Sequence, residues 1–447
     1  MKALEGAYIH TLGCPKNEAD SQTLAADLAA SGVNIVESPE TASHILVNTC
    51  GFIEDARAES IQAILEALQE FGPAQVLVMG CLVERYREEL AAELPEVDGW
   101  YGLGDVHALR DRLTAEAGSG ALRAGSAASA SAPQTASRSY AYLKISDGCD
   151  HLCSFCAIPQ IKGPYHAIPP AEIVANARRS LTQGARELVL VGQDTAIWRD
   201  GDVDLPGLVD ILAADQRVAR VRLMYLQPEH VTADLLEFMA THDKLCRYLD
   251  IPLQHASTSV LRRMGRAGGA ESYLALLDKA RDLMPDVSVR STFIVGFPGE
   301  TDDDVETLIE FIGEAGLEHA GVFAYSAEEG TRAATLPGRV PARVVRDRLT
   351  LVAGAISDAA ERAVAERVGK MVDVMMDRLG DDDGPEGAFA AGRTCGQAPE
   401  VDGLTFLVGE GRRPSAVGEV VRVLLTESIG YDLVGTPIDA AEGSSCD

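Results

Sequence analysis

Between residues 7 and 101, the hydrophobic and polar positions switch repeatedly between a spacing typical of strands and one typical of helices. Each short apolar run precedes a helical stretch: Ala7–Leu12 before Glu18–Ala30, Ile45–Asn48 before Glu54–Glu70, and Gln75–Met79 before Glu84–Glu93. Strands that alternate with helices predict a mostly parallel sheet covered on both faces. We therefore expect an α/β domain over residues 1–114, with its ligand site beyond the carboxyl ends of the strands.

A second alternating series fills residues 140–368. Its predicted strands are Ala141–Ile145, Glu187–Val191, Val221–Tyr225, Tyr248–Ile251, Val287–Val295 and Ala320–Tyr325. Its helical stretches include Pro170–Gln183, Ala270–Leu283, Thr301–Ala315 and Ala342–Val368. Six strands with intervening helices predict a partial (β/α)6 barrel, whose chemistry gathers at the carboxyl ends of the strands.

Two further segments have patterns of their own. Residues 115–139 are Ala, Ser and Gly with little else, which cannot bury a core and predicts a flexible linker. Residues 369–440 carry short β runs between Gly-rich turns, at Met371–Asp377, Gly403–Leu407, Gly418–Leu425 and Tyr431–Gly435. They predict a small all-β barrel, followed by a tail over residues 441–447.

The composition of the 447-residue chain is that of a globular protein, with 46% hydrophobic residues. No apolar stretch approaches the length of a membrane-spanning helix, and residues 1–6 carry no apolar segment of a secretory signal. The nine cysteines are an odd number. We therefore expect a reducing, cytoplasmic location, with cysteines that bind metal rather than form a disulfide framework.

The net charge is strongly negative, −29 from 68 acidic and 39 basic residues. Such a charge disfavours nucleic acid, whose binding depends on neutralising phosphates, and favours a basic partner. Residues 372–447 alone hold fifteen Asp and Glu against five Arg. The alternative interpretation is that the charge only keeps the protein soluble.

Six cysteines form two sets of three. Cys149, Cys153 and Cys156 make a tight Cys-x3-Cys-x2-Cys loop after the first barrel strand, and Cys14, Cys50 and Cys81 each follow a strand of the first domain. Three thiolates can hold three irons of a cubane cluster and leave the fourth iron open. If the strands of the first domain are neighbours and parallel, their three sulfurs converge at one edge. The other cysteines, Cys246, Cys395 and Cys446, lack partners at ligand spacing and are predicted to be ordinary residues.

The loop Gly148-Cys149-Asp150-His151-Leu152-Cys153-Ser154-Phe155-Cys156 resembles the signature of radical S-adenosylmethionine (SAM) enzymes. A structural zinc loop is the alternative, but zinc sites usually have four ligands in two close pairs. The resemblance implies a 4Fe–4S cluster whose open iron chelates SAM. The protein then orients SAM, sets the cluster potential and excludes water and oxygen.

The rest of the chain resembles the methylthiotransferase family. The matching runs are Leu12-Gly13-Cys14-Pro15-Lys16-Asn17, Asn48-Thr49-Cys50-Gly51-Phe52-Ile53, Gly80-Cys81-Leu82, Asp250-Ile251-Pro252-Leu253-Gln254-His255 and Val295-Gly296-Phe297-Pro298-Gly299-Glu300-Thr301. The resemblance implies a flavodoxin-like first domain with a second 4Fe–4S cluster on Cys14, Cys50 and Cys81, and a C-terminal TRAM domain. Cys-Pro-Lys-Asn at residues 14–17, Pro-Glu-Val-Asp-Gly at 399–403 and Tyr431-Asp432-Leu433-Val434-Gly435 are similar to the RimO branch.

The same resemblance suggests contacts for SAM. Gln193 and Asp194 end the second barrel strand, where Gly192-Gln193-Asp194 would receive the methionine amino group. Gly296, Gly299 and Glu300 end the fifth, where the glycines would let adenosine approach the backbone. The alternatives are that the glycines are ordinary turn residues and that Asp194 caps a helix.

One region departs from the family pattern. Relatives usually carry Arg-Gly and then Ser-Arg-Pro after the cysteine loop, whereas this chain has Lys162-Gly163 and, at the second arginine position, Ile168. Lys162 keeps a positive charge but cannot make the bidentate contact of an arginine, and Ile168 has no charge. Site assignments across residues 162–168 therefore do not transfer.

The RimO branch modifies small-subunit ribosomal protein S-twelve, so the resemblance implies addition of a methylthio group to the β-carbon of an aspartate on a basic loop. It also implies a reductant protein such as flavodoxin or ferredoxin. Two alternatives remain: a transfer-RNA adenosine methylthiotransferase of the same family, and a non-catalytic iron–sulfur carrier. A TRAM domain that serves RNA should be basic, and the acidic one here favours a cationic protein.

Overall fold

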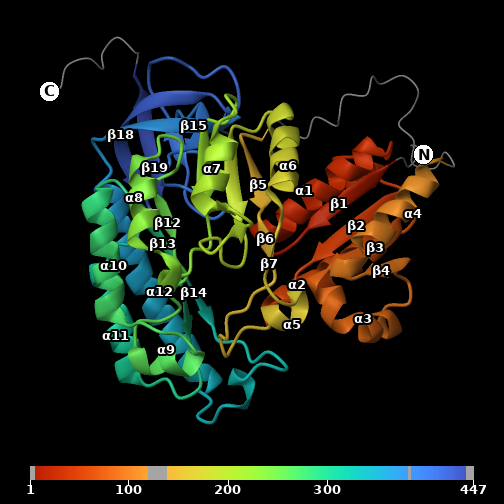
Figure 1. Ribbon diagram of the computed structural model, residues 1–447, viewed down its shortest axis with the longest axis horizontal. Helices are drawn as coiled ribbons and strands as arrows, with labels where there is room; N and C mark the ends of the chain where they lie inside the picture. The colour runs from red at the N-terminus through yellow and green to blue at the C-terminus, as the bar shows by residue number, and fades with distance from the viewer. Residues whose placement is uncertain (1–5, 119–137, 381–383, 439–447) are drawn as a thin grey trace. The chain divides into compact units, whose positions relative to one another are not determined.

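The computed structural model describes residues 6–118, 138–380 and 384–438, which divide into two compact units (Figure 1). The first unit holds the N-terminal segment together with residues 142–151 and 156–168. The second holds residues 137–141, 152–155 and the chain from residue 169 onward. Within these described segments, no helix is both long and apolar enough to cross a bilayer.

The first unit is built on a four-stranded parallel sheet in the order β1-β2-β3-β4. Its strands are β1 (Ala7–Thr11), β2 (His44–Thr49), β3 (Gln75–Gly80) and β4 (Gly99–Tyr101), and its main helices are α1 (Pro15–Ala30), α2 (Glu54–Glu70), α3 (Cys81–Glu93) and α4 (Val106–Gly118). A single parallel bridge from Ile35 to Ala7 lies at the free edge of β1. With Ile35 counted as a reduced second strand, the order is 2-1-3-4-5, which is the flavodoxin-like order expected from the sequence.

Both faces of this sheet are covered because its strands are apolar on both sides. In β2, Leu46 joins a core built with α1 and α4, while Ile45 and Val47 join a core built with α2 and α3. Successive side chains of a strand point to opposite faces, so one buried strand supplies both cores.

The partial barrel has six strands, which belong to the second unit except that β5 is divided between the two units. Its strands are β5 (Tyr140–Lys144), β8 (Glu187–Val191), β11 (Arg220–Leu223), β12 (Tyr248–Asp250), β13 (Ser288–Val295) and β14 (His319–Ala324). They form two sheets, β11-β8-β5 and β12-β13-β14, and a parallel bridge between Val221 and Leu245 connects β11 to the segment that enters β12. The strands thus follow one another around the barrel in sequence order, as predicted.

Helices follow the barrel strands: α6 (Pro170–Thr182), α7 (Leu205–Ala213), α8 (Ala233–Thr241), α9 (Thr258–Met264), α10 (Ala270–Leu283), α11 (Asp302–Ala315) and α12 (Ala342–Ala365). The start of α11 shows how the sequence sets these boundaries. The Thr301 hydroxyl accepts a hydrogen bond from the Asp304 amide, and the Asp304 carboxylate accepts one from the Thr301 amide. This capping box satisfies two amides that the helix leaves free, and Gly316 in the left-handed conformation ends the helix.

The C-terminal part of the second unit is a closed five-stranded barrel in the order β15-β16-β17-β19-β18. Its strands are β15 (Met371–Leu379), β16 (Ala390–Arg393), β17 (Thr405–Leu407), β18 (Val420–Ile429) and β19 (Asp432–Pro437). In β18, Val421, Val423 and Leu425 enter the core and alternate with exposed neighbours, the period expected for a strand with one buried face.

The structure differs from the sequence predictions at several boundaries. Helix α4 continues to Gly118, so residues 115–118 are helical where a linker was predicted, and residues 119–137 lie outside the described residues. Strand β16 was missed because Ala390-Ala391-Gly392-Arg393 contains no typical strand former. Helix α3 begins at Cys81 rather than at Glu84, which places this thiol in the first helical turn.

A buried ion-pair network joins the two parts of the second unit. The Glu187 carboxylate of β8 is fully buried and accepts hydrogen bonds from Arg220 at 2.8 Å, Arg222 at 2.7 Å and Arg393 of β16 at 2.8 Å. Arg393 also pairs with Asp377 of β15 at 2.7 Å. Burial opposes ionisation, yet the three guanidinium groups hold the pKa of Glu187 well below its usual range. The network fastens the partial barrel to the C-terminal barrel.

We predict that Glu187→Gln lowers the free energy of unfolding by about 3–5 kcal/mol, because it leaves buried guanidinium groups without an anion. Urea denaturation followed by circular dichroism measures the change. The matched control is Glu314→Gln, at an exposed position in α11. A loss no larger than that of the control would contradict a stabilising role for the network.

Candidate functional site

The carboxyl edge of the first sheet gathers the three cysteines that follow β1, β2 and β3. These strands are parallel neighbours, and Cys14, Cys50 and Cys81 come within three residues of their ends. Cys50 and Cys81 are buried, and Cys14 lies close enough for its charge to raise the pKa of both of these thiols. The convergence predicted from the sequence is therefore present.

Two glycines make this close approach possible. Gly13 has φ +92°, and a Cβ there would lie 2.6 Å from the Cβ of Cys50 and 3.0 Å from its sulfur. Gly80 has φ +104°, and a Cβ there would lie 2.6 Å from the carbonyl oxygen of Thr49. Any side chain at either position would push the cysteine-bearing loops apart.

Polar side chains fix the first two of these loops. Asn17 donates to the carbonyls of Leu12 at 2.9 Å and Thr49 at 3.1 Å, so it joins the first loop to the second. Ser60 of α2 accepts from the Cys50 amide and donates to the Cys50 carbonyl, both at 3.0 Å. Because these groups are hydrogen-bonded in a buried place, the loops are positioned before any ligand arrives.

The electrostatics of the thiols favour a bound metal. Burial raises the pKa of Cys50 and raises the pKa of Cys81 to about 12, so neither thiol ionises readily without a cation. Lys16 lowers the pKa of Cys50, and Lys162 lowers that of Cys81. Metal coordination removes a thiol proton outright, so this site is suited to a metal centre rather than to a free thiolate nucleophile.

Lys162, at one of the positions that depart from the family pattern, is a buried member of this environment. Its ammonium pairs with Asp147 at 3.1 Å and lies 3.9 Å from Asp20, and its side chain is only 2% exposed. Lys144 pairs with the same two carboxylates. The ammonium of Lys162 therefore acts on Cys81 as a fixed positive charge.

Ile168 is the other position that departs from the family pattern. Its backbone amide donates a hydrogen bond to the Ile145 carbonyl at 2.8 Å.

The donor set fits a three-cysteine iron–sulfur cluster. Three thiols meet at one edge, and two lysines supply positive charge that offsets the negative charge of a thiolate-bound cluster. No disulfide is formed by these cysteines. The packing of Cys81 against Ala157 and Ile161 keeps the site apolar on that side.

The second cysteine set lies on the loop after β5. Gly148 has φ +69°, and a Cβ there would lie 2.0 Å from the Pro164 carbonyl oxygen. The Cys149 amide donates to the Gly163 carbonyl at 3.1 Å, and Cys156 comes two residues before α5 (Ile158–Lys162). Cys149 and Cys156 belong to the first unit and Cys153 to the second, so their convergence on one cluster remains an expectation from their spacing.

The middle of this loop is held by the partial barrel. Ser154 donates its amide to the Met264 carbonyl at 2.8 Å and its hydroxyl to the Arg263 carbonyl at 2.7 Å. One guanidinium nitrogen of the buried Arg266 lies 3.7 Å from the Cys153 sulfur, as a hydrogen-bond donor. A positive charge is thus fixed beside one sulfur of the predicted SAM-binding cluster.

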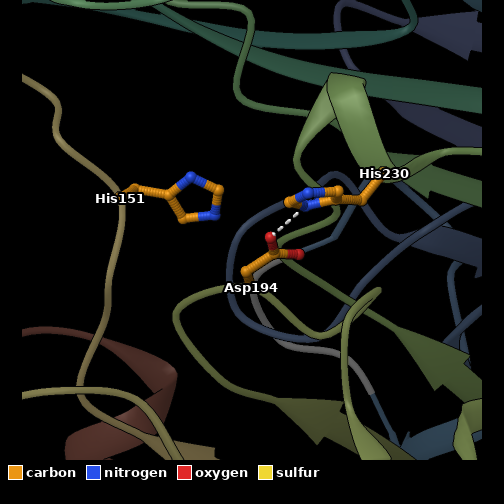
Figure 2. Close-up of side chains that lie close together, drawn as sticks. All are labelled: His151, Asp194 and His230. Atoms are coloured by element: carbon orange, nitrogen blue, oxygen red, sulfur yellow. Dashed lines mark hydrogen bonds and ion pairs between the residues drawn. The ribbon is translucent and has the colours of Figure 1, made fainter.

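Polar groups gather at the carboxyl ends of the barrel strands. After β8, the buried Asp194 accepts a hydrogen bond from the Ala196 amide at 3.2 Å and lies 2.6 Å from Nδ1 of His230 (Figure 2). The residue before it, Gln193, has a buried side-chain nitrogen with no hydrogen-bond partner among the described residues. A buried unpaired donor next to an oriented carboxylate fits a polar ligand such as the methionine part of SAM.

Strained backbone marks the same end of the barrel. Tyr225, after β11, has φ +62°, and Gln254, after β12, has φ +69°. Non-glycine residues in this region are uncommon and gather at functional sites. Gln227 is a further polar residue at this end of the barrel, and its side-chain oxygen accepts a hydrogen bond from Arg266 at 2.7 Å.

The loop after β13 is a turn fixed by Glu300. The Glu300 carboxylate accepts from the Gly296 amide at 2.9 Å and pairs with Arg348 at 2.8 Å. Burial raises the pKa of Glu300, although these contacts favour its ionised form. Gly296 and Gly299 both have φ +79°, which the turn requires. Glu300 is therefore occupied with shaping the loop that the glycines would offer to adenosine.

The sequence analysis identified the cysteines and the strand ends but missed several polar partners. Ser60 lies on α2, outside the run that carries Cys50, and His230 and Arg266 lie outside every motif of the sequence analysis. One signal for His230 was available in the sequence, the polar run Gln227-Pro228-Glu229-His230 after a predicted strand. Polar residues at that position face the barrel opening.

Three family models match consecutive parts of the chain. The uncharacterized protein family UPF0004 matches residues 6–102, the radical SAM superfamily matches residues 143–312, and the TRAM domain matches residues 368–438. Among solved structures, the radical SAM methyltransferase TsrM from Kitasatospora setae, with cobalamin and a [4Fe–4S] cluster, aligns over 72% of both chains with a TM-score of 0.51 and 14% identity. At that identity, the likeness concerns the fold alone.

Curated relatives match almost from end to end. Proteins named ribosomal protein uS12 methylthiotransferase RimO are 39% identical in a Nocardioides species, over 98% of both chains, and 41% identical in Desulforudis audaxviator, over 95% of both. The protein of that name from Thermotoga maritima is 36% identical over 96% of this chain and 99% of its own length. With its parallel thiol-bearing sheet, partial barrel and closed C-terminal barrel, this chain belongs to the RimO family of radical SAM methylthiotransferases.

Proposed function

We propose that this protein attaches a methylthio group to the β-carbon of an aspartate in ribosomal protein uS12. The observation that carries the proposal is the meeting of Cys14, Cys50 and Cys81 at one sheet edge, in a chain that also holds the Cys149, Cys153 and Cys156 loop. Full-length similarity to relatives of that name supports the substrate. A carbon–hydrogen bond that a side-chain base cannot break requires radical chemistry.

Two [4Fe–4S] clusters and SAM would supply the electron, the carbon radical, the sulfur and the methyl group. The chain's own residues have positioning roles. Cys149, Cys153 and Cys156 would hold the SAM-binding cluster, and Cys14, Cys50 and Cys81 would hold the cluster that binds the sulfur. Gln193 and Asp194 would orient SAM, and apolar packing would keep water from the reacting atoms.

The charge of the chain favours a cationic protein over RNA as substrate. The C-terminal segment from residue 372 carries fifteen acidic residues against five arginines, and one of those five, Arg393, is buried in the ion-pair network. An RNA-binding barrel would need exposed cations to neutralise phosphates. The acidic C-terminal segment would attract a basic ribosomal protein, and the association of the two would slow as the salt concentration is raised.

A flavodoxin or ferredoxin would be the reductant.

The direct test of the proposal is an anaerobic assay with the reconstituted, reduced enzyme, SAM and sulfide. We predict that uS12 gains the mass of one methylthio group in place of hydrogen, and that fragment spectra place it on an aspartate. Transfer RNA is the parallel substrate, and Cys149→Ala is the inactive control. Modified transfer-RNA adenosine with unchanged uS12 would establish the other branch of the family, and SAM cleavage with neither product would refute both.

We predict that Cys14→Ala loses about half of the bound iron and acid-labile sulfide, because one of two four-iron clusters loses a ligand. The SAM-binding cluster should keep its spectroscopic signal. Cys395→Ser, at an exposed cysteine outside both sets, should retain all the iron. If Cys14→Ala kept the full iron content, the three-thiol site would not be a cluster site.

We predict that Arg266→Gln moves the midpoint potential of the SAM-binding cluster to a more negative value, on the order of tens of millivolts. The guanidinium beside the Cys153 sulfur stabilises the reduced cluster, which carries one more negative charge. A redox titration monitored by electron paramagnetic resonance measures the shift. The control is Arg262→Gln, at an exposed position of α9. An unchanged or more positive potential would show that Arg266 has no such effect.

A further inference from the structure

Two cysteines outside both cluster sites lie next to each other in the second unit. Cys246 is buried between β11 and β12, and Cys395 is exposed in the turn between β16 and β17. The thiol of Cys246 hydrogen-bonds to the sulfur of Cys395. Their separation in the sequence hid this contact, which the prediction that both are ordinary residues without partners at ligand spacing did not foresee.

The backbone on both sides fixes the contact. The Cys246 amide donates to the Val221 carbonyl at 2.8 Å, which anchors it to β11. Arg222, also on β11, donates to the Cys395 carbonyl at 2.8 Å. The same strand therefore holds both cysteines, and the pair bridges the partial barrel and the C-terminal barrel.

The surrounding charges suit a thiolate at Cys395. The adjoining network brings three guanidinium groups, of Arg220, Arg222 and Arg393, to two carboxylates, of Glu187 and Asp377. A thiolate at Cys395 would supply a third negative charge. The hydrogen bond from Cys246, with Arg220 and Arg222, lowers the pKa of Cys395 to about 6, whereas burial raises the pKa of Cys246 well above its usual value.

We infer that Cys395 and Cys246 form a reactive dithiol site that exchanges with small disulfides, with Cys395 as the exposed nucleophile and Cys246 as the resolving thiol. An exposed, ionised cysteine beside a buried protonated one is the arrangement that thiol–disulfide exchange requires. The chain thus carries a modification site separate from the six cluster cysteines.

The exchange balances with the small disulfide as oxidant. The Cys395 thiolate attacks one sulfur of the disulfide, breaks its sulfur–sulfur bond and releases one small thiolate. Cys246 then gives its proton to the released small thiolate and attacks the Cys395 sulfur of the mixed disulfide, releasing the second small thiolate. The two protein sulfurs lose two electrons, which the small disulfide gains. The resulting bond would tie the C-terminal barrel to the partial barrel and constrain the unfolded chain.

The test uses the anaerobic holoenzyme, whose cluster cysteines are ligated, equilibrated with glutathione disulfide and trapped with N-ethylmaleimide. Peptide mass spectrometry should find a Cys246–Cys395 cross-link, and the oxidised protein should unfold at a higher temperature until dithiothreitol reverses the bond. The visible absorbance of the clusters, unchanged during the treatment, excludes cluster loss as the source of reactive thiols.

Two variants separate the roles of the two thiols. Cys246→Ala should accumulate glutathione on Cys395, and Cys395→Ser should form neither adduct nor cross-link, while circular dichroism checks that both variants fold. In the reduced wild-type protein, alkylation of Cys395 at pH 7 should also be faster than that of an ordinary thiol. The inference is overturned if the wild-type protein shows both cysteines fully alkylated, or a stable Cys395 adduct without the cross-link.

Discussion

The structure depends on one geometric constraint: parallel strands end at the same edge of their sheet. Cys14, Cys50 and Cys81 are separated by whole strand–helix units, yet each follows a neighbouring strand. Gathering three thiols, two of them buried, is unfavourable unless something offsets their desolvation. Asn17 and Ser60 satisfy backbone groups of the loops with hydrogen bonds, and a bound cluster would replace the thiol protons.

In the second unit, buried charged groups are stabilised by pairing with one another. Glu187 brings Arg220 and Arg222 of one barrel strand together with Arg393 of the C-terminal barrel, so the two parts share one buried anion. Such a network requires every member, because any single loss leaves a charge unpaired in a low-dielectric environment. Two of these guanidinium groups, those of Arg220 and Arg222, also lower the pKa of the nearby Cys395, after the larger effect of its hydrogen bond with Cys246.

The sequence was sufficient to predict the parts of the fold that depend on repeated local patterns. Alternating strand and helix periods identified three of the four strands of the first sheet, all but β4, and the six barrel strands. Cysteines at strand ends identified the thiol edge. Strand β16 and helix α4 beyond residue 114 were missed, because Ala-Ala-Gly-Arg has little strand character and an alanine-rich segment is equally typical of a linker. Asp194 with His230, Arg266 with Cys153, and Cys246 with Cys395 depend on tertiary packing between loops, which no local spacing encodes.

Anomalous diffraction at the iron absorption edge, from crystals of anaerobically prepared protein, tests the central claim most directly. The account predicts two separate groups of iron atoms, one of which lies at the edge of the first sheet. That group should have the sulfurs of Cys14, Cys50 and Cys81 as its protein ligands and one iron without a protein ligand. Iron found only at the loop of Cys149, or a fourth protein ligand at the sheet edge, would contradict it.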